Sequence, residues 1–232
     1  MNKQDLALLK DCLASLGAPA DDGKLSLFAD FYKLVTEANE RFNLTAICDE
    51  RDFVIKHFID SVQALPFIKR GARLCDIGAG AGFPSMPLAI SREDISVTAI
   101  DSTLKKMSFL GDCAKSLGVL NLVARAVRAE EATDLYCSFD VVTARAVAPL
   151  SVLLELAAPL LKIGGVFIAY KADDSELAKS KSAQQILNIY NTGIKKFSLP
   201  NGDPRALILF EKTSDTPKKY PRRYSAIKKF PL

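Results

Sequence analysis

The chain has 232 residues, of which 49% are hydrophobic and 25% are charged. This length and composition are enough for one sizeable core, with or without an appended subdomain. The longest apolar stretch, residues 147–161, contains two prolines and a glutamate and falls short of the roughly 20 apolar residues that a membrane span needs. The first residues alternate charged and apolar side chains, unlike a signal peptide, so we expect a cytoplasmic protein.

The five cysteines and the single histidine do not have the spacing of metal ligands. Zinc sites and disulfide frameworks need paired spacings such as Cys-x-x-Cys, and the sequence contains none. We therefore expect buried, reduced thiols and no bound metal.

The first 70 residues have helical periodicity. Apolar residues recur at helical spacing in three stripes, within residues 6–16, 27–35 and 53–62. Two segments rich in turn-forming residues, 17–19 and 43–45, separate these stripes. The pattern predicts a helical cap that precedes a different kind of fold.

From residue 71 onward, β-rich runs alternate with helical runs, which predicts an α/β fold with a mostly parallel, seven-stranded sheet. Strands are expected at 73–77, 96–100, 122–127, 139–143, 166–170, 195–199 and 206–211. Helices are expected at 84–91, 104–117, 149–161 and 175–190. No helix is expected between the last two strands, only a short segment that contains Pro-Asn-Gly-Asp, so they should form an antiparallel hairpin at one edge, as in Rossmann-like methyltransferases.

The net charge of +4 is unevenly distributed. Residues 212–232 hold seven Lys or Arg and one acid, a net +6, so residues 1–211 carry −2. Tyr220, Tyr224 and Phe230 lie among these charges, which suits phosphate contacts and stacking on unpaired bases, although a frayed terminus remains an alternative. The chain is thus expected to comprise a helical cap (1–70), a Rossmann-like domain (71–212) and a basic C-terminal tail (213–232).

Residues 73–84, Arg-Leu-Cys-Asp-Ile-Gly-Ala-Gly-Ala-Gly-Phe-Pro, are the most informative segment. Gly78, Gly80 and Gly82 follow an apolar strand, where glycine lets the backbone take a positive φ and approach a ligand closely. A dinucleotide fingerprint would need its third glycine at the position of Phe83. A pyrophosphate site is therefore disfavoured, and the spacing favours S-adenosylmethionine, which has no phosphate.

Polar residues follow the expected strands at the same edge of the sheet. Asp76 precedes the glycines, and Asp101 ends the second strand, where its carboxylate can accept hydrogen bonds from a ribose diol. Asp101 alone does not distinguish this cofactor from NAD, and a helix N-cap is its alternative role. Ala129 and Glu130 follow the third strand, where methyltransferases contact the adenine edge. Arg145 follows the fourth strand and suits a carboxylate or a phosphate.

These segments, in this order, resemble the RsmG (GidB) family, the bacterial 16S rRNA guanine-N7 methyltransferases. The match runs from about residue 40 to the end. Its motifs are Asn-Leu-Thr-Ala-Ile (43–47), Lys-His-Phe-Ile-Asp-Ser (56–61), the glycine segment (76–84), Asp-Ser-Thr-Leu-Lys-Lys (101–106), Arg-Ala-Glu-Glu (128–131), residues 139–146, and Tyr-Pro-Arg-Arg (220–223). The resemblance implies methyl transfer from S-adenosylmethionine to N7 of a guanine in 16S rRNA.

The resemblance also assigns site residues. It implies cofactor contacts at Gly78, Phe83, Ala129, Glu130 and Arg145. The glycine motif and the end of the second strand add four further candidates for cofactor binding: Asp76, Gly80, Gly82 and Asp101. It places a His-x-x-Asp-Ser motif beside the pocket, and the candidates for positioning the substrate are Asn43, His57, Asp60, Ser61, Arg145 and Lys171. A lone histidine among apolar helix positions is more often a packed residue than a catalyst, so the role of His57 stays open.

The chemistry of N7 methylation agrees with this set of residues. Guanine N7 has a free lone pair, so no proton leaves on methylation and no general base is assigned; catalysis should depend on positioning and electrostatics. The chain lacks the Pro-Cys pair typical of methylation at a pyrimidine C5. It also lacks the Asn/Asp-Pro-Pro-aromatic motif typical of methylation at exocyclic amines. Both absences fit a ring-nitrogen target.

An RNA partner would explain the basic tail. Side chains cannot reach N7 in the deep major groove of an A-form helix, so the target should lie in a loop or in incompletely folded RNA. RNA contacts are expected at Lys105, Lys106, Arg128, Lys218, Lys219, Arg222, Arg223, Lys228 and Lys229, although a solvated helix face is the alternative for the first two. The expected partner is 16S rRNA or the 30S subunit, with a monomer as the default.

Three other functions remain open at this point. The chain could be a methyltransferase of the same fold that acts on a small molecule or a protein. It could also be an RNA-binding protein that senses the cofactor without catalysis. An NAD-dependent oxidoreductase is the most distant alternative, because Phe83 occupies the position of the third glycine.

Overall fold

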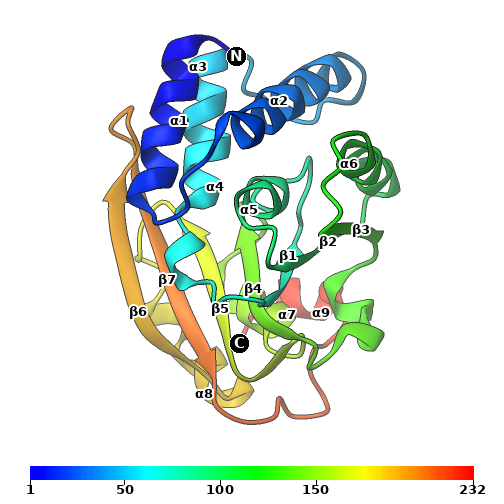
Figure 1. The fold of residues 1–232 in the computed structure, drawn as a ribbon. Coiled ribbons are helices and arrows are strands. Elements are labelled where there is room, and N and C mark those ends of the chain that lie inside the picture. The colour runs from blue at the N-terminus through cyan, green and yellow to red at the C-terminus, as the bar shows by residue number, and fades with distance from the viewer.

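The computed structural model describes residues 1–232, apart from the side chain of Phe42. Its central element is a seven-stranded sheet in the order β3-β2-β1-β4-β5-β7-β6 (Figure 1). The strands are β1 (Arg73–Ile77), β2 (Ser96–Asp101), β3 (Leu122–Ala126), β4 (Phe139–Arg145), β5 (Leu161–Lys171), β6 (Ile189–Ser198) and β7 (Pro204–Lys212). Strands β1 to β5 are parallel, whereas β7 runs antiparallel to both β5 and β6. The predicted fold class, with its antiparallel hairpin at one edge, is confirmed.

The helices precede, connect and follow these strands. The α-helices are α1 (Lys3–Ser15), α2 (Asp22–Phe42), α3 (Glu50–Phe53), α4 (Asp60–Val62), α5 (Ser85–Ser91), α6 (Leu104–Ser116), α7 (Leu150–Ala157), α8 (Lys181–Leu187) and α9 (Tyr224–Lys229). A π-helical segment, η1 (Val54–Ile59), joins α3 to α4. The short 3-10 helices are η2 (Leu65–Phe67), η3 (Ala129–Glu131), η4 (Thr133–Leu135) and η5 (Ala178–Ser180).

The sheet separates two hydrophobic cores. Helices α1 to α6 lie on one face and α7, α8 and α9 on the other (Figure 1). Phe31 and Met86 are buried in the first core, and Leu153 and Ile227 in the second. The three apolar stripes predicted in the first 70 residues are the buried sides of α1, α2 and the helix from α3 to α4. The boundaries proposed at residues 70 and 212 stay predictions.

Two expected helices are shorter than the sequence pattern suggested. The helix expected over 149–161 ends at Ala157, because Pro159 lacks an N–H donor, and Leu161 already belongs to β5. The helix expected over 175–190 is reduced to η5 and α8. Asn188 ends α8 in the left-handed conformation at φ 55°, and β6 begins at the next residue. Both helices lose residues to strands that are longer than predicted.

The C-terminal segment is folded onto the body of the protein. Residues 224–229 form α9, which packs against α7, and the side chain of Ile227 is fully buried. The alternative of a frayed terminus is therefore wrong for this part of the chain.

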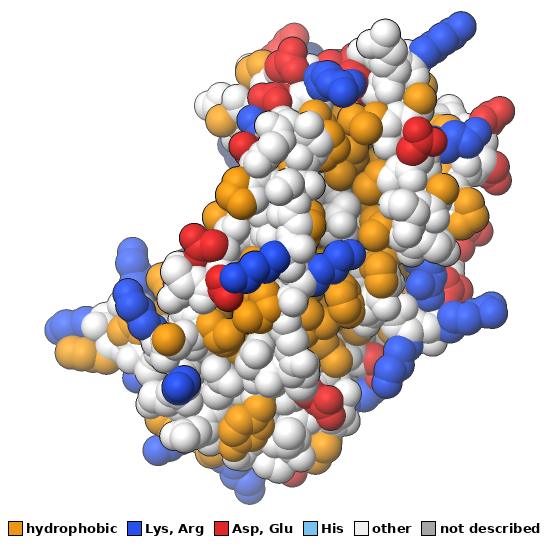
Figure 2. Space-filling model, turned by 90° about the vertical axis from the view of Figure 1, so that its left-hand side faces the viewer, with side chains coloured by type: hydrophobic (Ala, Val, Ile, Leu, Met, Phe, Trp, Pro, Cys, Tyr) orange, Lys and Arg blue, Asp and Glu red, His pale blue; other side chains and the backbone are white. Residues whose placement is uncertain are grey.

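No helix among the described residues is both long and apolar enough to span a membrane. On the face that carries the edge strand β6, basic, acidic and hydrophobic side chains are intermixed (Figure 2).

Candidate active site

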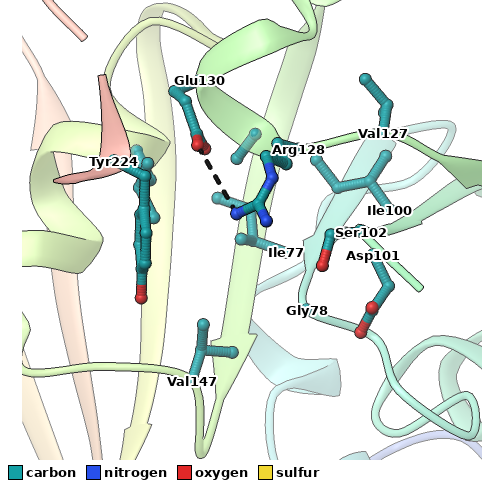
Figure 3. Close-up of a pocket in the computed structure, with 12 residues that line it drawn as sticks. Ile77, Gly78, Ile100, Asp101, Ser102, Val127, Arg128, Glu130, Val147 and Tyr224 are labelled. Carbon is teal, nitrogen blue, oxygen red and sulfur yellow. Dashed lines mark ion pairs between the residues drawn. The ribbon is translucent and has the colours of Figure 1, made fainter. Parts of the chain in front are cut away.

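A cavity lies at the carboxyl ends of the parallel strands. The strand order reverses between β1 and β4, and ligands of open α/β sheets bind in the crevice at such a switch point. The segments that follow β1, β2, β3 and β4 enclose a cavity of about 230 Å³ (Figure 3). Its lining residues are Ile77, Gly78, Ile100, Asp101, Ser102, Val127, Arg128, Ala129, Glu130, Val147, Leu156 and Tyr224.

The glycine loop fits between this cavity and the first core. Gly78 has φ 68° and donates its N–H to the carbonyl of Ile100 at 2.8 Å. A Cβ on Gly78 would lie 2.5 Å from Cγ2 of Val147. Gly82, at φ 107°, packs on the other side, where a Cβ would lie 2.6 Å from Cδ1 of Leu110. Glycine is therefore required at both ends of the loop, at one end for the cavity and at the other for helix packing.

Two carboxylates give the cavity its hydrogen-bond acceptors. Asp101 accepts from the N–H of Gly80 at 3.2 Å and of Thr103 at 2.8 Å, so its carboxylate is held in one orientation. Glu130 is largely buried, and its Oε1 forms an ion pair with Nη1 of Arg128 at 4.0 Å but has no hydrogen-bond partner among the described residues (Figure 3). A buried acceptor without a hydrogen bond is costly unless a ligand donates to it. Hydroxyl and amino donors of an adenosine group would satisfy both carboxylates, so the residues present fit S-adenosylmethionine.

Of the residues expected to bind the cofactor, Gly78, Asp101, Ala129 and Glu130 line the cavity. The others, Asp76, Gly80, Gly82, Phe83 and Arg145, are not among its lining residues.

Asp76 lies beneath the glycine loop. It is fully buried and accepts hydrogen bonds from the hydroxyls of Ser85 and of Thr143. Burial raises the pKa of Asp76 to about 6, even though these two hydrogen bonds oppose the shift. Asp76 thus joins β1, β4 and the start of α5.

Arg145 forms a second polar cluster with residues of η1 and α4. Its guanidinium donates to the carbonyl of Lys56 at 2.6 Å, to Oδ2 of Asp60 at 3.0 Å and to Nδ1 of His57 at 3.1 Å. The guanidinium also lies over the ring of Phe83, 5.6 Å from its centroid. Lys56 and His57 belong to the π-helical segment η1, and such segments occur frequently at functional sites. These contacts use three of the five N–H donors of Arg145 and leave two without an acceptor among the described residues.

His57 is held as a neutral side chain. Its ring stacks on Phe83 with centroids 4.4 Å apart, and its Nε2 lies 2.8 Å from Oγ1 of Thr45. Because an arginine can only donate, Nδ1 must accept from Arg145, and the imidazole proton is assigned to Nε2. Burial, and then the charge of Arg145, lower the pKa of His57 to about 3. At neutral pH His57 therefore orients Arg145 and is not a general base.

The remaining candidates for positioning the substrate do not join this cluster. Asn43 is exposed and ends α2 in the left-handed conformation, at φ 47°. Ser61 is fully buried and donates to the carbonyl of His57 in its own helix. Lys171 donates to the carbonyl of Ala148 at 2.9 Å and to Oε1 of Glu176 at 3.0 Å. The structure thus brings together only His57, Asp60 and Arg145.

A basic groove adjoins the cavity. It has a volume of about 670 Å³ and shares Arg128, Glu130 and Tyr224 with the cavity. Its lining residues are Arg128, Glu130, Glu131, Pro221, Arg222, Arg223, Tyr224, Ser225 and Lys228. Four of the nine residues expected to contact RNA thus line one groove: Arg128, Arg222, Arg223 and Lys228. The others lie elsewhere on the surface: Lys105 and Lys106 on α6, Lys218 and Lys219 before α9, and Lys229 at its end.

Arg222 also has a structural role that the sequence pattern did not reveal. Its backbone N–H and its Nε donate to Oε1 of Glu155 at 2.8 and 2.9 Å, and its Nη2 donates to Oε2 at 2.6 Å. Glu155 lies on α7 and is fully buried. Arg222 is therefore engaged with Glu155 and anchors the C-terminal segment.

Sequence reasoning missed several cavity residues. Ile77, Ile100 and Val127 supply apolar walls from the strand ends, and a search for polar motifs passes over them. Val147 lies two residues after Arg145, the last residue of β4. Its position just beyond a strand end could have indicated that it lines the cavity. Tyr224 is separated from the glycine loop by most of the domain, and no pattern in the sequence joins the two.

Among the described residues, no group of His, Cys, Asp and Glu side chains is arranged to hold a metal ion.

The sheet order and the cavity at its switch point define the class I S-adenosylmethionine-dependent methyltransferase fold. Among solved structures, the cyclase SpnF matches with a TM-score of 0.60 at 13% identity, over 84% of this chain and 98% of that one. M. jannaschii TYW2 in complex with AdoMet matches with a TM-score of 0.57 at 15% identity, over 72% of this chain and 79% of that one. At these identities the two likenesses establish the fold.

The family follows from sequence relatives. The family model GidB, "rRNA small subunit methyltransferase G", matches residues 24–204. Ribosomal RNA small subunit methyltransferase G of Pediococcus pentosaceus is 42% identical, over 96% of both chains, and that of Bacillus velezensis is 40% identical, over 95% of both. The chain belongs to the RsmG (GidB) family of rRNA small subunit methyltransferases. The predicted family, enzyme class and cofactor are therefore confirmed.

Replacing Gly78 by alanine should weaken cofactor binding as well as the fold. The left-handed backbone at φ 68° penalises any Cβ by about 1 kcal/mol. The added Cβ would also displace the side chain of Val147, which lines the cavity. Gly71 is a matched control, because it has the same φ of 68° with nothing within 4 Å of its Cβ position. Urea unfolding and calorimetric titration with S-adenosylhomocysteine should show a loss of affinity for Gly78→Ala only; equal affinities would contradict the assignment of the cavity.

His57 should make the stability of the protein sensitive to acid. Its pKa of about 3 in the folded state lies below the ordinary value of 6.5, so between these values the unfolded chain binds a proton that the folded chain does not. The contribution is therefore complete above pH 6.5 and is lost as the pH falls toward 3. Between pH 7 and 4.5, the wild type should lose about 2.5 kcal/mol more free energy of unfolding than His57→Gln.

Urea unfolding at the two pH values measures this difference. His57 is the only histidine of the chain, and the titration of Asp76 is common to both proteins, so it cancels in the comparison. An equal loss of stability in the two proteins would show that His57 titrates normally in the fold.

Proposed function

We propose that the protein transfers the methyl group of S-adenosylmethionine to N7 of a guanine in 16S rRNA, free or within the 30S subunit. The observation that carries the proposal is the continuity of two sites: the cofactor cavity and the basic groove share Arg128, Glu130 and Tyr224. A groove lined by basic side chains suits RNA phosphates. RNA bound there would therefore lie beside the cofactor. An rRNA substrate also supports the predicted cytoplasmic location.

The cavity residues would hold the cofactor by its adenosine part. Asp101 is oriented to accept from the ribose hydroxyls, and Glu130 and Ala129 lie where the adenine edge would be bound. When bound, S-adenosylmethionine supplies a methyl group on a positively charged sulfur, which becomes a neutral thioether as the N7 lone pair takes the methyl. The protein needs no base for this transfer, since N7 carries no proton.

The cluster around Arg145 supports the proposal from the substrate side. Two N–H donors of Arg145 remain available at the carboxyl end of β4, where they can bind a phosphate, a carboxylate or a base carbonyl. His57 and Asp60 fix the direction of the guanidinium, so these donors are preorganised. Because His57 stays neutral, the rate of methyl transfer should not follow its titration.

The test is methyl transfer from labelled S-adenosylmethionine to naked 16S rRNA, 30S subunits and 70S ribosomes, with the label mapped to single nucleotides. We expect label at N7 of a guanine in 16S rRNA. A 16S transcript made with 7-deazaguanosine is the matched control, because it carries carbon in place of N7 and should accept no methyl group. Label on another atom, or equal label on the 7-deaza transcript, would refute N7 as the target.

The same assay separates the alternatives. A methyltransferase for another substrate would label no rRNA and would turn over in an RNA-free assay. A cofactor sensor would bind both S-adenosylmethionine and rRNA without incorporation of label.

A further inference from the structure

The C-terminal helix supplies one wall of the cofactor cavity. Tyr224, the first residue of α9, lines the cavity together with Gly78 and Asp101, which lie at the other end of the domain in sequence. In Figure 3 its ring stands across the cavity from Arg128 and Ile77 and is seen nearly edge-on, so a face of the ring is turned toward the cavity. Neither the glycine loop nor the strand-end motifs account for this wall.

The position of Tyr224 is fixed by anchors on both sides. Arg222, two residues before it, donates three hydrogen bonds to the fully buried carboxylate of Glu155. Ile227, three residues after it, is fully buried in the core beneath the sheet. Glu155 belongs to α7, and the next residue of that helix, Leu156, lines the cavity as well. The tyrosine is therefore held at the cavity by the fold.

The ring of Tyr224 presents a face that accepts a flat group. The guanidinium of Arg128 lies over it, with Cζ 6.0 Å from the ring centroid. Arg128 is exposed and lines the basic groove as well as the cavity, so its side chain has room to leave the ring. When Arg128 moves away, a planar base can take the place of its planar guanidinium on the face of the ring.

We propose that Tyr224 binds the adenine ring of the cofactor by stacking, and that the C-terminal segment thereby forms part of the cofactor site. Adenine in this position would lie beside Glu130, whose Oε1 has no hydrogen-bond partner among the described residues. The inference rests on the cofactor site of the proposed function. It gives the C-terminal segment two roles, one in binding the cofactor and one in the basic groove.

Calorimetric titration of the full chain with S-adenosylhomocysteine tests the stacking. Tyr224→Ala should raise the Kd about tenfold, the usual effect of removing an aromatic platform beneath a base. Tyr224→Phe keeps the ring and should restore the affinity to within about twofold of the wild type. Tyr190→Ala is the matched control, because Tyr190 is a partly exposed tyrosine on β6 that does not line the cavity.

A fluorescent probe reports on the ring directly. The chain has no tryptophan, so Tyr224→Trp and Tyr190→Trp each contain a single one. Adenine stacked on an indole should quench the emission of the first variant when S-adenosylhomocysteine is added, and should leave that of the second unchanged. This readout requires no loss of affinity, so it remains decisive if Tyr224→Ala fails to fold.

Unchanged emission of Tyr224→Trp at saturating ligand, or an unchanged Kd for a folded Tyr224→Ala, would overturn the inference. Neither measurement uses RNA. A protein that binds S-adenosylhomocysteine through Tyr224 but labels no guanine N7 would refute the proposed function and leave the inference standing.

Discussion

An Arg145→Ala variant is expected to methylate rRNA at least about 100-fold more slowly than the wild type, because it removes the preorganised guanidinium that positions the substrate. Arg145 ties the end of β4 to Lys56, His57 and Asp60 of the helical layer. Asp60 is buried, and its remaining cationic partner is Arg205, whose Nε lies 3.7 Å from its Oδ1. The free energy of unfolding should therefore also fall, by about 2 kcal/mol.

Initial rates on 30S subunits, together with titration of S-adenosylhomocysteine, separate the two roles assigned to Arg145. Because Arg145 does not line the cavity, the Kd of the ligand should change by no more than about threefold while the rate falls. Arg73→Ala is the control, since Arg73 is exposed at the start of β1, the opposite end of that strand from the site. A large rise in Kd would instead make Arg145 a cofactor contact, and an unchanged rate would refute its role in positioning.

Most of the fold could be predicted because its signals are local. The first strand, residues 73–77, is flanked by a turn and by glycines, and its predicted limits coincide with those of β1. The antiparallel hairpin followed from the short segment, residues 199–203, that connects β6 to β7. The errors arose where helix and strand meet without a strong break. Ile189 and Tyr190 are apolar enough to extend a helix, but pairing with β7 places them in a strand.

The residues of the site could be predicted from the sequence only where they lie at the end of a strand. Gly78 directly follows β1 and Asp101 ends β2, so their places at the cavity follow from the sequence, since the carboxyl ends of parallel strands meet at one edge. Phe83 shares the glycine motif, yet its ring packs against His57 on the opposite side of the loop. Spacing gives the order of residues in a loop. The direction of each side chain depends on the packing around it.

Contacts between distant segments leave no trace in a single sequence. The seven basic residues from 212 to 229 form a charge run, and nothing in it distinguishes Arg222 from its neighbours. Its difference lies in Glu155, a single acid within an apolar helix pattern 67 residues earlier. An isolated acid in such a helix does signal a buried partner, because a buried carboxylate must be paired. The sequence does not show which cation supplies the pair.

An Arg222→Ala variant is expected to lose about 3 kcal/mol of its free energy of unfolding, because it leaves the carboxylate of Glu155 buried without its charged partner. Glu155 would keep only the backbone N–H of residue 222 as a donor, out of the three contacts that it now receives. The loss should be nearly independent of salt, since the carboxylate is fully buried and poorly screened. In a thermal melt it corresponds to a fall in Tm of about 8 °C.

The neighbouring residue provides a matched control. Arg223 is exposed and lines the basic groove, so Arg223→Ala should change the free energy of unfolding by no more than about 0.5 kcal/mol while weakening the binding of 30S subunits. A double variant, Glu155→Met with Arg222→Met, removes both charges and should recover much of the stability lost by Arg222→Ala. If Arg222→Ala and Arg223→Ala were equally stable and differed only in RNA binding, Arg222 would be an RNA contact without a structural role. If Arg222→Ala were destabilised and the double variant recovered, the ion pair with Glu155 would be what holds the C-terminal segment on α7.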